Sequence, residues 1–329
     1  MARNRSVTPP AKSPESAQIA LKEVALAARA PEPRAPLFGA HMSVAGGIQK
    51  AVYAAHAIGF GTVQVFTKNN NQWRGHELTD AAIEAFRGAL AETGVTSPVA
   101  HTSYLINLAS PDEALWQKSI DAMTVEVERC AALGIEDLVV HPGAHLGTGE
   151  DAGLARVAAA LDEVGRRTRG LSVMVDLETT AGQGTCLGAS IEHLGRIAER
   201  VREPERLGLC GDTCHLFAAG YALDSDAGYA RMAEDLERIA GLLRERVWHL
   251  NDSKRELGSR VDRHEAIGRG KIGLEAFRRL VNDPRRLGLP MILETPKGVS
   301  DGEEWDAINL RVLRGLAQGK PPRRRSNKV

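Results

Sequence analysis

Short apolar segments alternate with longer amphipathic segments along most of the chain. The apolar segments predict strands at 37–41, 61–66, 98–101, 137–141, 171–178, 207–212, 246–250 and 290–294. The segments that follow them predict helices at 46–59, 79–93, 112–133, 150–169, 188–202, 226–244, 273–281 and 303–317. Strand–helix units repeated across 37–318 predict one α/β domain, a (β/α)8 TIM barrel. An open, doubly wound sheet is the alternative.

The two ends of the chain lack this alternation. Residues 1–36 are rich in Ala, Pro, Ser and Arg, and residues 319–329 form a basic segment, so both are predicted to be disordered tails. The whole chain has 42 basic and 42 acidic residues. The tails hold eleven of the basic and three of the acidic residues, which leaves the segment 37–318 with a net charge of −8. An acidic barrel favours either a partner that is not a polyanion or bound cations.

Histidines and carboxylates gather where the predicted strands end. The last six strands end at His101, His141, Glu178, Asp212, His249 and Glu294, and the loops beyond them carry His215, Asp262 and His264. In a TIM barrel all strands end at one face, which is the face that holds the active site. Imidazole and carboxylate ligands without thiolates suit zinc or manganese. Nine ligands exceed the needs of one ion, so we expect a multinuclear metal cluster, which suits phosphoryl transfer.

The cysteines and the apolar segments say less about function, but they indicate the cellular compartment. Cys130, Cys186, Cys210 and Cys214 form no CxxC pair and are expected to be free thiols of a reducing compartment. No stretch approaches 18 uninterrupted apolar residues, and the N-terminus lacks a compact apolar segment. We therefore expect no transmembrane helix, no secretory signal and a cytoplasmic protein without a membrane partner.

Several long segments resemble a known family. These are "HTSYLINLASP", "HPGAH", "ETTAGQG", "DTCHLFAAGY", "HLNDSK", "GSRVDRHEAIGRG" and "ILET", which are similar to the signature segments of endonuclease IV, a zinc-dependent DNA-repair family that cleaves DNA at abasic (AP) sites. The resemblance runs from about Leu37 to about Leu316. It implies three zinc ions per chain, with manganese as an alternative at some sites.

The resemblance also implies the ligand sets. His101 and His141 hold one zinc, and Glu178 bridges this ion to a second. Asp212, His249 and Glu294 complete the second set. The third set is His215, Asp262 and His264. Glu178 and Glu294 are in addition implied to be catalytic residues.

The reaction implied by the resemblance belongs to base excision repair. Zinc-activated water attacks the phosphorus 5′ to an abasic site in double-stranded DNA, which leaves a 3′-hydroxyl and a 5′-deoxyribose phosphate. Removal of 3′-blocking groups by the same phosphate site is implied as well. The protein is expected to be a monomer that associates with the nucleoid during repair.

Five residues are predicted to contact DNA: Tyr104, Asn71, Lys68, Trp73 and Arg263. The tyrosine matches a position that penetrates DNA in the family, whereas the asparagine stands where some members have Arg. The lysine and the tryptophan follow the second predicted strand, where they suit backbone contact and stacking. The arginine stands between two metal ligands and is placed to reach a phosphate.

Two further positions depart from the family pattern, because Thr102 and Thr179 stand where Asp and Asn are common. His41, at the end of the first strand, points to the same barrel mouth without an implied ligand role; a phosphate contact, a contact to a ligand and a structural hydrogen bond are all open.

Two other functions compete with the endonuclease. A metal-dependent sugar isomerase or epimerase shares the barrel architecture and would suit the acidic core, but its one or two metals leave Asp262 and His264 without a role. A protein that recognises damaged DNA without cutting it is the third hypothesis, motivated by Thr102, Thr179 and Asn71.

Overall fold

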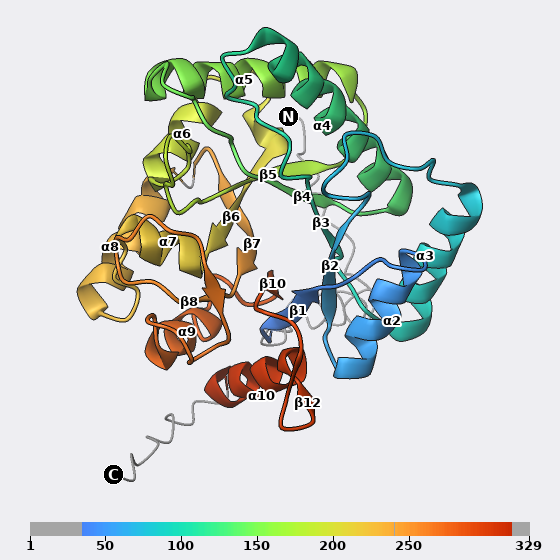
Figure 1. Ribbon diagram of the computed structural model, residues 1–329, viewed down its shortest axis with the longest axis vertical. Coiled ribbons are helices and arrows are strands. Elements are labelled where there is room, and N and C mark those ends of the chain that lie inside the picture. Colours follow the sequence, from blue (N-terminus) through green and yellow to red (C-terminus); the bar gives the residue numbers. More distant parts are fainter. Residues whose placement is uncertain (1–34, 240, 318–329) are drawn as a thin grey trace, which may run out of the picture. The chain divides into compact units, whose positions relative to one another are not determined.

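The computed structural model describes residues 35–239 and 241–317, and eight parallel strands of this part close into a barrel (Figure 1). The strand order is β1-β10-β7-β6-β5-β4-β3-β2. The first strand pairs with the last, as Leu37 lies opposite Pro290, and with the second, as Gly39 lies opposite Thr62. The predicted TIM barrel is confirmed, and the open sheet is excluded. The predicted disorder of 1–36 and 319–329 falls on residues that, apart from 35 and 36, lie outside the described ones.

The strands match the predicted positions closely. They are β1 (Leu37–His41), β2 (Thr62–Phe66), β3 (Val99–His101), β4 (Asp137–Val140), β5 (Met174–Glu178), β6 (Leu207–Asp212), β7 (Arg244–His249) and β10 (Pro290–Leu293). Two short hairpins add β8 (Asp252–Ser253) with β9 (His264–Glu265), and β11 (Val299–Ser300) with β12 (Glu303–Glu304).

Helices surround the barrel (Figure 1). They are α2 (Gln49–Ile58), α3 (Asp80–Thr93), α4 (Glu113–Leu133), α5 (Glu150–Arg167), α6 (Ile191–Ala198), α7 (Thr213–Ala219), α8 (Asp226–Ile239), α9 (Leu274–Val281) and α10 (Trp305–Ala317). They are shorter than predicted at the first residues, the last residues or both, since periodicity does not mark where a helix begins or ends. Helix α7 was not predicted, because seven residues are too few to show a helical period.

Two layers of apolar side chains hold the fold together. The larger lies between the barrel and its helices. A smaller, fully buried cluster consists of one residue from each of five strands: Val99, Val139, Cys210, Val247 and Ile292. Residues from five strands meet only inside the barrel, so this cluster fills its interior. None of the helices in the described part of the chain has both the length and the apolar composition needed to span a membrane.

The interior leaves no room for a side chain at Gly39. A Cβ atom there would lie 2.6 Å from the carbonyl oxygen of Thr62 and 2.9 Å from Cδ1 of Ile292. Overpacking of this kind costs about 1–3 kcal/mol, so we expect Gly39→Ala to lower the free energy of unfolding by that amount in urea denaturation. The control is Gly88→Ala in α3, where a Cβ meets nothing within 4 Å and helix propensity predicts a small gain. Equal stability of the two variants would contradict this prediction.

Candidate metal centre

The alternation of side chains between the inside and the outside of the barrel places the predicted ligands together. Side chains two residues apart on a strand point to the same face. Each of the five residues of the interior cluster is followed two positions later by a predicted ligand. In chain order these ligands are His101, His141, Asp212, His249 and Glu294. These side chains therefore form the next interior layer, at the carboxyl ends of the strands, and Glu178 joins them from the end of β5.

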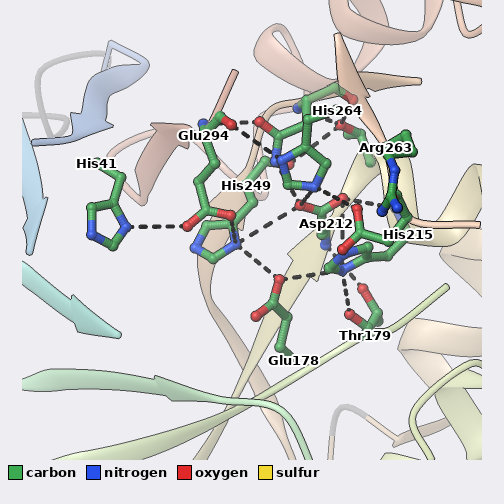
Figure 2. A network of polar contacts seen from close by, with 12 residues as sticks. His41, Glu178, Thr179, Asp212, His215, His249, Arg263, His264 and Glu294 are labelled. Carbon is green, nitrogen blue, oxygen red and sulfur yellow. Dashed lines mark hydrogen bonds and ion pairs between the residues drawn. The ribbon is translucent and has the colours of Figure 1, made fainter. Parts of the chain in front are cut away.

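The structure brings all nine predicted ligands into three groups. In each group, atoms able to bind a metal lie within 4.8 Å of one another. The groups are His101, His141 and Glu178; Glu178, Asp212, His249 and Glu294; and His215, Asp262 and His264. Figure 2 shows Glu178, Asp212, His249, His264 and Glu294 turned toward one another.

Glu178 is the centre of the arrangement. Its side chain is fully buried, and one carboxylate oxygen, Oε2, lies 3.1 Å from Nε2 of His101 and 3.0 Å from Nε2 of His141. The other oxygen lies 2.9 Å from Nδ1 of His249. Each oxygen thus faces a different group, which is the geometry a bridging carboxylate needs.

Local structure fixes the third group. The Asp212 side chain accepts a hydrogen bond from the backbone N–H of His215 at 2.8 Å, caps α7 and so directs His215 toward the barrel axis. Asp262 lies 3.2 Å from His215 and 3.1 Å from His264. Asp252 holds the loop between His264 and α9. Its buried carboxylate accepts hydrogen bonds from the backbone N–H groups of Gly268, Gly270 and Ile272.

The histidines are oriented by their second ring nitrogen. Nδ1 of His101 donates to the carbonyl of Thr102 at 2.8 Å, and Nδ1 of His215 to the carbonyl of Thr179 at 2.8 Å. Ring nitrogens held in this way leave the other nitrogen free as a ligand. Thr102 and Thr179 are the positions expected to depart from the family pattern, and because these contacts use their backbone oxygens, they do not depend on the side chains. Thr179 also accepts the backbone N–H of Asp212 through its hydroxyl.

The electrostatics of the site favour positive charge. Burial by itself would raise the pKa of Glu178, but the imidazoles of His249, His141 and His101 outweigh it and hold the pKa well below its usual range. Burial lowers the pKa of His249, and the carboxylates of Glu294 and Glu178 overcome this effect and raise it to about 9. Four buried or half-buried carboxylates therefore create a strongly negative potential in a site with little solvent to screen it.

The donor set fits divalent cations. Nε2 of His264 is buried 3.1 Å from Asp262 but makes no hydrogen bond with any described residue. A buried polar atom without a partner is rare and calls for a ligand such as an ion. Imidazole nitrogens and carboxylate oxygens are zinc's usual ligands together with thiolates.

Two cysteines also lie near the ligands. The sulfur of Cys210 lies within 4.8 Å of potential ligand atoms of Glu178 and His249. The sulfur of Cys214 lies within the same distance of those of Asp212 and His264. Burial raises the pKa of Cys210 well above its usual value and that of Cys214 to about 12. The nine imidazoles and carboxylates make up three complete groups without either thiol, so they remain the better candidates.

The predicted DNA contacts lie in different surroundings. Tyr104 is 58% exposed, and its ring lies beside His101 and His141 at the barrel mouth. The hydroxyl of Ser103 donates to the carbonyl of Asn70, which joins the loop of Tyr104 to that of the exposed Asn71. Arg263 is exposed, and its guanidinium donates to the carbonyl of Asp262 at 2.6 Å.

The other two predicted contacts are less accessible. Trp73 is half-buried against the core, with Nζ of Lys118 4.3 Å from its ring centre. The Lys68 side chain is 1% exposed and forms a 2.8 Å ion pair with Glu126. A DNA contact by Lys68 would first require this pair to break, so the structure gives Lys68 a role in holding α4 against the loop after β2.

Sequence reasoning missed two polar residues that contact the ligands. Asn251 donates to Asp212 at 2.7 Å and accepts the backbone N–H of Glu294 at 2.8 Å. Its place directly after His249 and Leu250, at a strand end, was a signal for it. The other is Gln64, a single amide in an otherwise apolar strand, for which the sequence offers no comparable signal.

Comparisons with known proteins agree with this geometry. The model of the xylose isomerase-like TIM barrel family matches residues 52–316. The chain is 52% identical over 284 residues to a probable endonuclease 4 of Chloroflexus aurantiacus, an alignment that covers 86% of this chain and 99% of the relative. It is 47% identical to a probable endonuclease 4 of Geobacter sulfurreducens over 88% of this chain and 97% of that one.

Among solved structures, endonuclease IV from Thermus thermophilus is 37% identical, with a TM-score of 0.75 over 87% of this chain and all of that one. A D-tagatose 3-epimerase-like protein is 19% identical, with a TM-score of 0.64 over 85% of this chain and 97% of that one. This second likeness shows a shared barrel fold alone.

Proposed function

The chain belongs to the endonuclease 4 group of the xylose isomerase-like TIM barrel family, and we propose that it is an AP endonuclease that uses three zinc ions. Its substrate is double-stranded DNA, which it cuts 5′ to an abasic site to leave a 3′-hydroxyl and a 5′-deoxyribose phosphate. Removal of 3′-blocking groups belongs to the same activity. The observation that carries the proposal is the meeting of nine ligands in three groups around Glu178.

The chain's own residues bind and orient the ions. His101, His141 and Glu178 hold the first, and Glu178 shares the second with Asp212, His249 and Glu294. His215, Asp262 and His264 hold the third, with manganese as an alternative ion at some sites. Bound zinc supplies Lewis acidity for a phosphoryl group and activates water at neutral pH.

The two glutamates have the roles closest to the reaction. Both are held ionised, because nearby imidazoles keep the pKa of Glu178 and of Glu294 below the usual range even though burial acts to raise it. Their negative charge would hold the cations at the barrel mouth, and the buried layer beneath them excludes water from the barrel interior. The proposed DNA-binding surface is formed by the exposed or partly exposed loops around this mouth, which carry Tyr104, Asn71 and Arg263.

We further propose that the protein acts as a monomer in the cytoplasm, at the nucleoid.

The acidic barrel mouth needs bound cations before it can accept a polyanion, since the four carboxylates would otherwise repel the phosphates of DNA. This requirement makes DNA binding at the mouth dependent on metal, whereas a small neutral sugar would not face the same repulsion.

The test is incision of a labelled duplex with one abasic site by zinc-loaded protein, with and without a chelator, together with metal analysis. We expect three zinc ions per chain, a 3′-hydroxyl product and loss of incision with chelator. An uncut duplex would contradict the proposal. One or two metals with turnover of a ketose would favour the sugar epimerase, and chelator-insensitive binding without incision would favour the binding protein.

A further inference from the structure

Gln64 is an amide buried among the proposed metal ligands. It lies in β2, its side chain is fully buried, and its neighbours Val63 and Val65 are apolar. A buried amide costs free energy unless its donors and its acceptor find partners. The partners of Gln64 therefore show what the side chain does.

Both ends of the amide contact residues of the second ligand group. Oε1 accepts a hydrogen bond from Nε2 of His249 at 2.8 Å. Nε2 donates to Oε1 of Glu294 at 2.7 Å and lies 2.9 Å from Nδ1 of His41. The reversed amide would set its oxygen against a carboxylate oxygen, so only this orientation satisfies Glu294.

This orientation decides which nitrogen of His249 binds metal. The hydrogen bond to Gln64 requires the proton on Nε2, which leaves the lone pair on Nδ1. Nδ1 faces the other ligands, 2.9 Å from Glu178 and 3.3 Å from Oε2 of Glu294. Gln64 engages only Oε1 of Glu294, so Oε2 is the oxygen left for an ion.

We propose that Gln64 is a positioning residue of the metal centre, whose amide selects the Nδ1-ligating form of His249 and holds Glu294 in place. The cation concerned is a divalent ion bound by Glu178, Asp212, His249 and Glu294, and the inference rests on the proposed metal-dependent function. Gln64 acts through these ligands and does not touch DNA. Outer contacts of this kind change metal affinity by about 10–100-fold.

A purely structural amide would behave like Thr62, two residues away on the same strand. Thr62 is also fully buried, and its hydroxyl donates to the carbonyl of Ser97 at 2.7 Å, a residue that is not one of the proposed ligands. Thr62→Val removes one buried hydrogen bond from the same strand without touching the site. It is therefore the matched control for loss of packing and hydrogen bonding in β2.

The experiment compares Gln64→Leu, Gln64→Met and Thr62→Val with the unchanged protein. Zinc affinity is measured by competition with a chromophoric chelator, and the protonated nitrogen of His249 by ¹⁵N NMR of the zinc-loaded protein. We expect either Gln64 variant to bind one of three zinc ions about 10–100-fold more weakly and to lose the single Nε2–H form of His249. Gln64→Met preserves side-chain length if Gln64→Leu fails to fold.

The outcomes separate the two proposals. Zinc affinity and a His249 tautomer that stay unchanged in Gln64→Met would overturn the positioning role alone, as would an equal loss of zinc affinity in Thr62→Val. Unchanged protein that binds no zinc would overturn the proposed function and this inference with it.

Discussion

Glu178→Ala is expected to abolish incision at abasic sites, by more than about 10³-fold even with excess zinc. The side chain belongs to two ligand groups at once, and its two oxygens face His101 and His141 on one side and His249 on the other. Its loss removes a ligand from two ions and the negative charge between them. Cleavage of the labelled duplex and the zinc content of the same preparation are the measurements.

The matched control for this variant is Asp176→Asn. Asp176 lies two residues earlier on β5 and is fully buried on the same face, and its Oδ1 lies 3.8 Å from Nε of Arg246, away from the ligand groups. It belongs to none of the ligand groups found among the described residues. Asp176→Asn is expected to retain zinc and incision. Near-normal incision by Glu178→Ala would refute the bridging role.

Lys68→Met is expected to lower the free energy of unfolding by about 3–5 kcal/mol, because it leaves the Glu126 carboxylate as an unpaired buried charge. Both side chains are 1% exposed. The hydroxyl of Thr67 also donates to Glu126, but a neutral donor does not replace a cation. Urea denaturation measures the loss. DNA binding should show the same salt dependence as the unchanged protein, since no phosphate contact is removed.

Two further variants separate a buried charge from a general effect of losing a lysine. Lys271→Met removes an exposed pair with Glu256 and should cost less than about 1 kcal/mol. The double variant Lys68→Met with Glu126→Leu should recover most of the stability, since apolar replacements of a buried pair are often neutral. A stable Lys68→Met variant whose DNA binding loses about one unit of salt slope would instead support the DNA contact.

The barrel and the meeting of the proposed metal ligands at one face were both predictable from the sequence. Apolar strands and amphipathic helices have different periods, and their regular alternation leaves few arrangements. The ends of parallel strands meet at one face, so residues such as His101 and His249 could be placed together without knowledge of which strands are neighbours. Long motifs such as "GSRVDRHEAIGRG" then supplied the family.

The sequence did not predict what surrounds those ligands. Gln64 and His249 are separated by 185 residues in the chain and lie on β2 and β7, which are not neighbours, so their hydrogen bond depends on closure of the barrel. Lys68 follows a strand as a DNA-contacting lysine would, and only the position of Glu126 on α4 turned it into a buried ion pair. Helix α7 begins where Asp212 caps it, in a segment too short for a periodic signal.

By itself, then, the sequence determined the fold class and the face that holds the site, because these follow from period and strand direction, and its motifs predicted the nine side chains that meet there. The tertiary structure decided which ring nitrogen of His101, His215 and His249 is free and which oxygen of Glu294 is engaged. Those choices are made by contacts of about 3 Å between distant segments, and hydrogen bonds of that length depend on packing that no local pattern encodes.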